Sequence, residues 1–512
     1  MHHRSSTFNF NTLETILLFS RCELAQLYGR ISPFLEKEYR VVHLAYGNEE
    51  ENILRNQYGI TEVLNFRTEV ARIHAAEKPD PALCNEIDQL IIAQSQNRFT
   101  LNGCIQYDRS FEYISYADSL LLAQTYYKLW KELLEKQQIR YLLHEPTSLF
   151  LNHIAALLCE ATQAKYLTPI QVYGNGPYNF LVVTGDNGRS EEIRYHMQNP
   201  VLPETDRQQA IEFLRDFRAD SETFLSAYMP TRRSFLSLTV ESTKMAVSAI
   251  KRKGRFQFRD RKPIDHLEIF LYEDRSFRRE LSRKWGTYFR LKYDIYDPEA
   301  DFYYYPIHLE PEAVVLYWGD GLYKNQVKLI ENAAAQLPPG CWLYVKDHPH
   351  AGAYRDLSDY LKIQAIPNVR LLDPAIPGKS IIQRSRGVIT INGTSGFEAL
   401  LLNKQVYTFG NSFYNPCKRV QQVRNIRDLQ TLLYAATDLT YTDSDELYRF
   451  VAAYLRSTHA GFTDYFANYV SMLGIAETEN AALVASNLLK YLAGCEFRNA
   501  EKSPTELATS NR

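Results

Sequence analysis

The sequence has no apolar run of 18 residues in its 512, so no segment predicts a membrane-spanning helix. The stretch Thr15–Ser20 is far too short for a secretory signal and runs into a charged pattern. Its 7 cysteines show no Cys-x-x-Cys spacing, which argues against zinc or a disulfide framework and favours reduced thiols. With a net charge of only −2, no overall field favours nucleic acid. We therefore expect a cytoplasmic protein with no nucleic-acid partner.

Apolar residues are plentiful, at 45% of the chain, and aromatic residues make up 13%. This is enough for sizeable cores, and the chain is too long for one core. No repeat of solenoid period is present. We predict an N-terminal Rossmann-like domain (1–200), a helical basic linker (201–265), a C-terminal Rossmann-like domain (266–420), further helices (421–497) and a disordered tail (498–512).

The first 200 residues alternate short apolar runs with amphipathic helical patterns. This alternation is typical of a parallel sheet covered by helices on both faces. Predicted strands are 16–19, 40–45, 61–65, 140–144 and 165–169, and predicted helices are 23–35, 49–58, 116–136 and a helix ending near 162. The sequence thus predicts an open α/β domain.

A second α/β series begins at His266, after a charged helical stretch. That stretch ends in Lys251–Lys262, where 7 of 12 residues are basic. We interpret this run as a solvated helix end or linker; the alternative is a patch facing anionic lipid or glycan. Predicted strands of the second series are 267–272, 303–307, 342–346, 369–372, 387–391 and 406–409, with a helix over 324–336. The fold class is therefore two doubly wound domains facing a central cleft.

Three strands of the second series run directly into polar residues. They end at His308, at His348-Pro349 and at Asn392-Gly393-Thr394-Ser395-Gly396. Parallel sheets bind ligands at the carboxyl ends of their strands, so we expect these tips to form the site. The last tip opens a predicted helix over 396–402, whose free amides and positive dipole end suit a phosphate.

His348 is aimed out of its strand end because Pro349 restricts the residue before it. A histidine there can donate to a phosphate or protonate a leaving group, and Lys346 adds positive charge. At the other tip, Thr394 and Ser395 would hold a phosphate, and Glu398 would accept from ribose hydroxyls. The alternative is an ordinary helix capped by Thr or Ser. That alternative leaves the two glycines of the motif unexplained.

Carboxylates beside the strand ends are candidate catalytic groups. Glu310 and Glu312 follow His308, and these three residues could act as a base or bind a sugar. In the first domain, Asp108 and Glu145 are our candidates for a carboxylate facing the cleft; a solvent-facing ion pair is the alternative for both. No Asp-x-Asp pair stands at a strand end, so the motifs require no metal.

These motifs, in order and spacing, resemble the capsule polysaccharide biosynthesis family. The matching residues are His308, Pro311 and Glu312; Val345, Lys346, His348 and Pro349; Thr390, Gly393, Thr394, Gly396, Glu398, Ala399 and Leu400; and Phe409, Gly410, Phe413 and Tyr414. The resemblance covers residues 303–414. It implies a two-domain glycosyltransferase of the type called GT-B, similar to enzymes that transfer Kdo from CMP-Kdo to a lipid-linked acceptor. By the same resemblance, His348, Thr394 and Ser395 would hold the donor phosphate.

We therefore expect a metal-independent glycosyltransferase of surface polysaccharide synthesis, with no cofactor beyond the nucleotide sugar that is its substrate. Its partners would be a nucleotide-sugar donor and a glycan or glycolipid acceptor. Contact of Lys251–Lys262 with lipid would place it at the inner face of the membrane. Two alternatives stay open. A nucleotide-sugar epimerase or hydrolase would need no acceptor, and a non-catalytic polysaccharide-binding or export-coupling protein would not need His348 or Thr394.

Overall fold

The computed structural model describes most of the chain. The described residues are 13–112, 114–176, 178–199, 201–220, 235–236, 238–240, 242–244, 246–247, 277–309, 315–321, 323–348, 355–435, 444–464, 470 and 473–500. Several predictions lie outside these ranges: the strand 267–272, the basic run Lys251–Lys262, the carboxylates Glu310 and Glu312, Pro349 and most of the tail.

The first half of the chain folds around a seven-stranded sheet in the order β13-β6-β5-β4-β1-β2-β3. Strands β1 to β5 are mutually parallel, whereas β6 and β13 pair antiparallel. All six residues of β1 are buried, as expected of a strand covered on both faces. The strands are β1 (Thr15–Ser20), β2 (Arg40–Ala45), β3 (Val63–Asn65), β4 (Ile139–Leu143), β5 (Lys165–Val172), β6 (Asn179–Thr184) and β13 (Thr458–Ala460).

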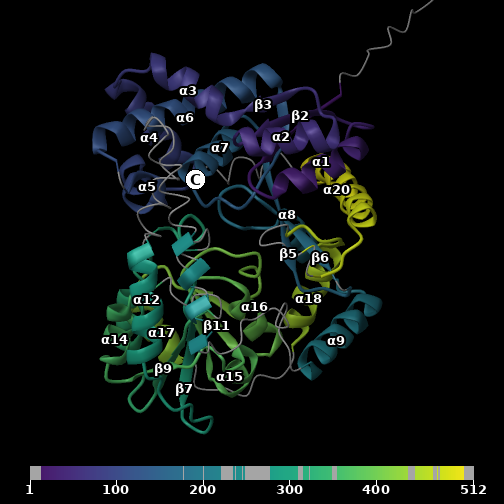
Figure 1. Ribbon diagram of the computed structural model, residues 1–512. Coiled ribbons are helices and arrows are strands. Elements are labelled where there is room, and N and C mark those ends of the chain that lie inside the picture. The colour runs from purple at the N-terminus through teal and green to yellow at the C-terminus, as the bar shows by residue number, and fades with distance from the viewer. Residues whose placement is uncertain are drawn as a thin grey trace, which may run out of the picture.

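Helices cover both faces of this first sheet. Leu17 and Phe19 face a core built with α6 and α7, while Ile16 and Leu18 face a core built with α1 and α20. In Figure 1, α20 near the C-terminus lies beside α1 near the N-terminus. The helices are α1 (Leu24–Leu35), α2 (Asn48–Tyr58), α3 (Phe66–Ala76), α4 (Pro81–Gln94), α5 (Leu101–Tyr107), α6 (Tyr116–Gln137), α7 (Phe150–Ala161), α8 (Glu191–Gln198) and α20 (Glu477–Ala500).

The second half contains a six-stranded sheet in the order β12-β11-β10-β7-β8-β9, parallel throughout. Tyr303 and Tyr305 face one core and Tyr304 faces the other, following the two-residue period of a strand. Its elements are β7 (Phe302–Pro306), β8 (Trp342–Lys346), β9 (Val369–Leu372), β10 (Gly387–Thr390), β11 (Gln405–Thr408), β12 (Val420–Gln422), α12 (Phe277–Arg290), α13 (Gln326–Ala334), α14 (Leu357–Gln364), α15 (Gly378–Arg384), α16 (Thr394–Leu401) and α17 (Ile426–Ala435).

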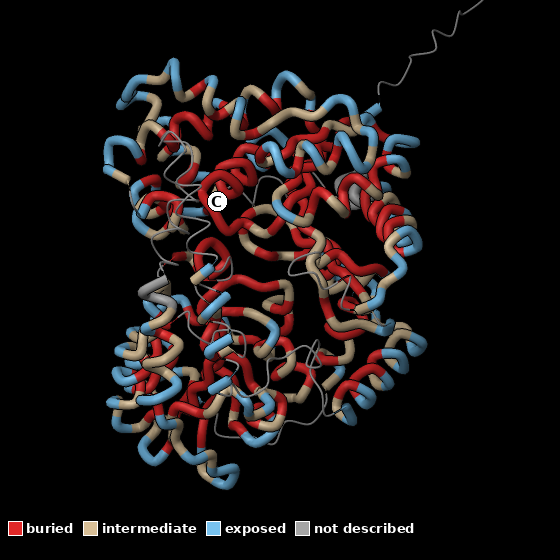
Figure 2. The backbone as a smooth tube through the Cα atoms, in the orientation of Figure 1, coloured by how far each residue is buried: buried red, intermediate tan, exposed pale blue. Residues whose placement is uncertain are grey.

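The two halves share part of their core. Helices α9 (Glu204–Ala219) and α18 (Asp445–Ser457) pack together, and one apolar cluster joins Val183 of β6 to Phe397 of the second half. Buried residues accordingly run through both halves of the backbone trace in Figure 2. The predicted class, two parallel-dominated α/β sheets, is confirmed. The predicted domain boundaries stay predictions.

Several elements differ from the predictions. Strands β6 and β13 were not predicted, and both pair antiparallel at the edge of the first sheet. The helix predicted over 324–336 is shorter, covering Gln326–Ala334.

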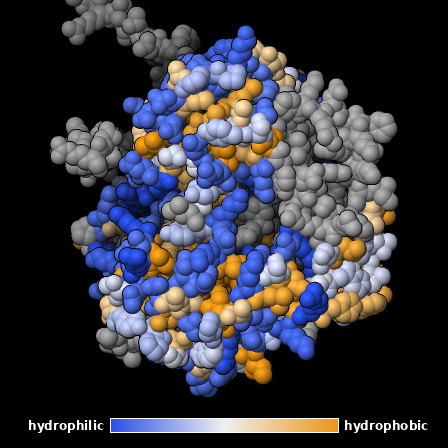
Figure 3. All heavy atoms as spheres, turned by 90° about the vertical axis from the view of Figure 1, so that its left-hand side faces the viewer, coloured by the Kyte–Doolittle hydropathy of each residue, from blue (hydrophilic) through white to orange (hydrophobic). Residues whose placement is uncertain are grey.

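Among the described residues, no helix has the length and apolarity needed to cross a bilayer. On the face shown in Figure 3, hydrophobic residues lie in groups among many hydrophilic ones, which is ordinary for a protein surface.

Candidate functional site

The second sheet reverses its winding between two central neighbours, β7 and β10. From β7 the chain proceeds to β8 and β9 on one side, and from β10 to β11 and β12 on the other. The loops after β7 and β10 therefore diverge and leave a crevice at the carboxyl ends of the strands. His308 follows β7, and the motif beginning at Asn392 follows β10. The structure thus brings together the strand tips after β7 and β10 at the place where such sheets bind ligands, and His348, at the third predicted tip, is close enough to His308 to affect its pKa.

His308 spans this crevice. Its Nε2 lies 3.0 Å from Thr390 Oγ1, which itself donates to the Asn392 carbonyl oxygen at 2.7 Å. The threonine hydroxyl has only one proton, so His308 Nε2 must be the donor to it. Burial, with the neighbouring charges of His348 and Arg355, lowers the pKa of His308 to about 3. His308 is therefore neutral at physiological pH, which suits a positioning role and not that of a cationic acid.

The two glycines of the motif each have a packing reason. Gly393 has φ 89° and ψ 178°, a conformation essentially restricted to glycine, and a Cβ there would lie 2.9 Å from His308 Cε1. At Gly396 a Cβ would overlap the hydroxyl of Tyr414, which donates to the Gly393 carbonyl oxygen at 2.9 Å. The hydrogen bond and the two close approaches together fix the backbone of this turn.

Helix α16 begins at Thr394, two residues before its predicted start, and Gly393 is its N-cap. No side chain caps this end, so the alternative of a Thr or Ser cap is wrong. Thr394 is exposed and Ser395 partly exposed, and within the described ranges neither hydroxyl makes a hydrogen bond. Amides of the first turn have no intrahelical acceptor, and the helix dipole adds positive potential. The helix start is therefore suited to an anion.

Two titratable side chains near the helix start have perturbed pKa values. Burial lowers the pKa of Lys346 to about 8 against the opposing effect of Asp347 and Glu398, and its Nζ donates to the Pro374 carbonyl at 3.4 Å. Burial also raises the pKa of Glu398 to about 7, although Lys379 and Lys346 oppose this. Desolvated groups that titrate near neutral pH are characteristic of functional sites.

The turn after β8 is held by Asp347, a residue that our sequence analysis missed. It is 2% exposed and accepts hydrogen bonds from the His348 amide at 2.8 Å and from the Tyr360 hydroxyl, and its carboxylate lies 4.0 Å from Arg355 Nε. Its position between two predicted site residues at a strand end was the available signal. Asp347 orients the segment that carries His348.

The first sheet has a matching reversal between β1 and β4. There Arg21 Nη2 contacts Glu145 Oε1 at 2.5 Å, and Asn152 Nδ2 donates to the same oxygen at 3.1 Å. Glu145 is 5% exposed, so the alternative of a solvent-facing pair is wrong for it. Burial alone would raise the pKa of Glu145, but Arg21 and His144 lower it below its ordinary value. A carboxylate of low pKa is a weak base at neutral pH. The predicted catalytic role of Glu145 stays a prediction.

Asp108 lies where the two halves of the chain meet and is 1% exposed. One carboxylate oxygen accepts from the amide and hydroxyl of Ser110, and the other accepts from the Tyr317 hydroxyl at 2.7 Å. Tyr317 belongs to the segment 315–321 after β7, and its ring stacks on His153 with centroids 4.1 Å apart. Asp108 is therefore also not solvent-facing, and each of its two oxygens already accepts a hydrogen bond, one from Ser110 and the other from Tyr317.

Arg98 bridges the halves at a second point. Its guanidinium contacts Asp186 Oδ2 at 2.5 Å and Asp320 Oδ1 at 2.9 Å. Asp320 precedes α13 but does not cap it, since the N-cap of that helix is Asn325. Asp320 instead has φ 60° and takes part in the bridge between the halves. The relative placement of the two sheets thus depends on buried polar contacts as well as on the shared core.

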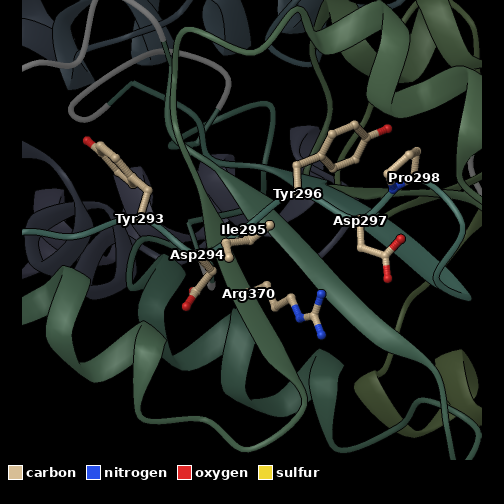
Figure 4. A pocket seen from close by; sticks show the side chains of 7 residues that line it. All are labelled: Tyr293, Asp294, Ile295, Tyr296, Asp297, Pro298 and Arg370. Atoms are coloured by element: carbon tan, nitrogen blue, oxygen red, sulfur yellow. The ribbon is translucent and has the colours of Figure 1, made fainter.

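The hollow drawn in Figure 4 has a volume of about 710 Å³ and lies away from the strand ends. It borders β9, where Asp294 pairs with Leu371 through hydrogen bonds of 2.9 and 2.7 Å. The labelled side chains, which include Tyr293, Tyr296 and Arg370, point in different directions in Figure 4. A binding site needs polar groups that converge, so this hollow is a poor candidate.

Within the described ranges, no cluster of three His, Cys, Asp or Glu residues could hold a metal ion.

Residues 277–431 match the family described as capsule polysaccharide biosynthesis protein. The matched segment contains His308, Lys346, His348 and the whole Asn392–Gly396 motif. The resemblance to this family, drawn above from those motifs, is confirmed for this part of the chain. The match covers less than a third of the chain and includes the strands β7 to β12 of the second sheet.

Individual relatives are more distant. The chain is 36% identical over 104 residues to Protein FixF of Sinorhizobium fredii, a match that spans 19% of this chain and 23% of that protein. A KpsC beta Kdo 2,4 transferase structure from Thermosulfurimonas dismutans is 13% identical with a TM-score of 0.38, covering 65% of this chain and 88% of that one. A UDP-GlcNAc 2-epimerase structure from Methanocaldococcus jannaschii is 12% identical with a TM-score of 0.25, covering 86% and 98%.

Proposed function

We propose that the protein is a glycosyltransferase of capsule polysaccharide biosynthesis. It binds a nucleotide-sugar donor at the carboxyl ends of the strands in the second sheet and transfers the sugar to a glycan or glycolipid acceptor. The observation that carries this proposal is the crevice between β7 and β10, where α16 starts without a side-chain cap and the buried cation Lys346 is close enough to Glu398 of that helix to act on its pKa. The match to the capsule family over residues 277–431 supports it.

In this proposal the donor phosphate lies against the first amides of α16 and the hydroxyls of Thr394 and Ser395. When the bond from sugar to phosphate breaks, negative charge grows on the departing nucleotide. The helix dipole and Lys346 stabilise that charge, and they need little reorganisation because they are already fixed in place. The neutral imidazole of His308 keeps the Gly393 turn in position through its packing. The carboxylate that activates the acceptor is sought among Glu145, Asp108, Glu310 and Glu312.

A nucleotide-binding screen tests the proposal directly. We expect CMP, UDP, GDP or ADP to raise the melting temperature of the purified protein, since a ligand present at a hundred times its Kd adds about 2.7 kcal/mol of stability. Lys346→Met should abolish the shift because it removes the buried cation. Lys362→Met is the matched control, since Lys362 is an exposed lysine paired with Asp359. No shift with any nucleotide would contradict the proposal and favour a non-catalytic polysaccharide-binding protein.

The affinity for a nucleotide sugar should fall as the pH rises from about 6 to about 9. Glu398, with a pKa of about 7, becomes negatively charged in this range, and Lys346, with a pKa of about 8, then loses its positive charge. Both changes oppose a bound phosphate, so we expect a loss of about tenfold or more. Titration calorimetry across this range measures the effect.

The variant Glu398→Gln separates the two steps of this pH dependence. It cannot acquire the negative charge, so only the upper step, which belongs to Lys346, should remain. A wild-type affinity that is constant over the range would exclude these two groups from the phosphate site. A separate analysis of the products, with and without an acceptor glycan, distinguishes a transferase from an epimerase, because an epimerase turns over without an acceptor.

A further inference from the structure

A second cavity, of about 330 Å³, lies in the first half of the chain. Its walls are the loop before α4 and residues of α4, α5 and α6, so it is separate from the crevice of the second sheet. Sites for small ligands measure roughly 300–1,000 Å³, and this cavity is at the lower end of that range. Its size therefore suits a single sugar ring.

Hydrogen bonds between the three helices hold the walls of this cavity. Asp88 Oδ1 of α4 accepts from the Leu101 amide at the start of α5 at 2.6 Å. The Tyr116 hydroxyl of α6 donates to Asn102 Oδ1 of α5 at 2.7 Å. The cavity is thus already formed before a ligand arrives, which reduces the ordering cost of binding.

The helix starts at this cavity offer no site to an anion. The side chains of Asp80, Thr100 and Ser115 cap α4, α5 and α6, and each accepts from one or two amides of the first turn. At α16, by contrast, no side chain takes that place. The described residues that line the cavity include the carboxylates of Asp80 and Asp88 but no lysine, arginine or histidine. An anionic ligand is therefore disfavoured here.

The polar part of the lining offers both acceptors and donors. Asp80 and Asp88 each use Oδ1 within the protein, and among the described residues their Oδ2 atoms accept no hydrogen bond. The side-chain amides of Asn85 and Asn102 likewise donate none within that part of the chain. A hydroxyl group can donate to a carboxylate and accept from an amide, so the lining suits a ligand with several hydroxyls.

The remainder of the lining is mainly apolar. Tyr116 is 58% exposed although its hydroxyl is bound to Asn102, so much of its ring is open to a ligand. Leu101 and Leu120 add aliphatic surface. The C–H face of a sugar ring can pack on such a surface while its hydroxyls meet the polar groups.

Helix α5 connects this cavity with the second half of the chain. Its first residues line the cavity, and its last residue, Tyr107, lies against the second half, where a Cβ on Gly321 would be 2.6 Å from the Tyr107 ring. α5 has 7 residues and is therefore about 10 Å long. Figure 1 shows it on the side of the first half that faces the second. The cavity is thus one short helix away from the junction of the halves.

We propose that this cavity binds one neutral sugar residue of a glycan, at a site separate from the nucleotide crevice. The sugar hydroxyls donate to Oδ2 of Asp80 and of Asp88. They accept from the amides of Asn85 and Asn102, and the ring packs on Tyr116. The two carboxylates repel an acidic sugar. The further role of holding the glycan acceptor during transfer rests on the proposed function, whereas the sugar preference of the cavity does not.

Saturation-transfer NMR with two pairs of glycosides tests the site in the full chain. The pairs are methyl glucoside with methyl glucuronide and methyl galactoside with methyl galacturonide, and the members of a pair differ only in the carboxylate. We expect the neutral member of at least one pair to bind, and its acidic counterpart to bind about tenfold or more weakly at low ionic strength. If neither neutral glycoside binds, or if the acidic one binds as tightly, the proposal is wrong.

Two exposed positions provide variants that should not disturb the core. Tyr116→Ala and Asn85→Ala should each weaken binding of the neutral glycoside by about tenfold or more. Tyr434→Ala, at a tyrosine of α17 that is 50% exposed, is the matched control and should leave binding unchanged. Asp88→Asn keeps an acceptor for the Leu101 amide and removes one charge, so it should narrow the preference for the neutral glycoside. Binding that is the same in wild type and in both alanine variants would place the sugar elsewhere and overturn the proposal.

The outcomes separate this inference from the proposed function. Nucleotide binding in a protein that binds neither neutral glycoside would overturn the sugar site and leave the transferase proposal standing. Glycoside binding that depends on Tyr116, in a protein that binds no nucleotide, would support the site and contradict the transferase. Lys346→Met should abolish nucleotide binding and leave glycoside binding intact, because Lys346 does not line this cavity.

Discussion

Replacing Arg21 by methionine should lower the free energy of unfolding by about 3–5 kcal/mol at neutral pH. The substitution leaves Glu145 buried and ionised without its cation, which lies 2.5 Å away in the native protein. Asn152 cannot compensate, because a single amide donor does not balance a full charge. Urea unfolding followed by circular dichroism measures the loss. The effect is large because both side chains are almost fully withdrawn from water.

The loss of unfolding free energy in Arg21→Met should depend on pH, and the pKa of Glu145 sets the direction of that dependence. In the native protein the pKa of Glu145 is lowered, so the pair stabilises the fold above the ordinary carboxyl pKa and this contribution is lost as the pH falls. Without Arg21, burial raises that pKa instead. The deficit of Arg21→Met should therefore shrink as the pH falls through the raised pKa of Glu145 in the variant, where Glu145 takes up a proton.

Two further variants complete the test of the Arg21 pair. Arg21→Met combined with Glu145→Gln removes both charges and should recover much of the loss. Arg72→Met breaks exposed pairs with Glu69 and Glu132 and should cost about 0–1 kcal/mol for each. A deficit for Arg21→Met no larger than that of Arg72→Met would contradict the assignment of a buried ion pair.

Gly393→Ala should weaken nucleotide binding more than about tenfold. An alanine there is strained by about 1–3 kcal/mol in the backbone, and its Cβ also meets His308 Cε1 at 2.9 Å. The turn can relieve both only by moving, and that movement displaces the first amides of α16 from the phosphate. Calorimetric titration of wild type and variant with the nucleotide selected in the thermal screen gives the ratio of affinities.

Gly340→Ala is the matched control for this variant. Gly340 also has a positive φ, of 85°, but a Cβ there would meet nothing within 4 Å, and the residue lies at the opposite end of β8 from the site. It should lose stability and keep its nucleotide affinity. If Gly393→Ala binds nucleotide as well as Gly340→Ala does, the start of α16 is not the phosphate site.

Much of the sheet architecture could be predicted because it is encoded locally. The strands at 40–45, 342–346 and 369–372 match the structure to the residue, since each is a compact apolar run bounded by polar residues. β13, with the sequence Thr-His-Ala, has no such signal. It becomes a strand only because β6 offers it an edge, and that pairing joins residues more than two hundred positions apart.

The part of the candidate site that lies at the strand ends could also be predicted from the sequence. The strand tips at His308 and Asn392 come together because the carboxyl ends of parallel strands share one edge. The partners of the carboxylates could not be predicted. Glu145 meets Arg21 across the first sheet, and Asp108 meets Tyr317 only when the two halves dock. Such contacts depend on the three-dimensional arrangement, and a single sequence contains no record of it.

The return of the chain to the first sheet has a consequence for its synthesis. β13 and α20 leave the ribosome after the whole of the second sheet, yet they cover the edge at β6 and the face of α1. Until then, the nascent first half carries an unpaired strand edge and an apolar helix face, the surfaces most prone to aggregation. The sheet translated first can therefore be completed only after the second sheet has been translated.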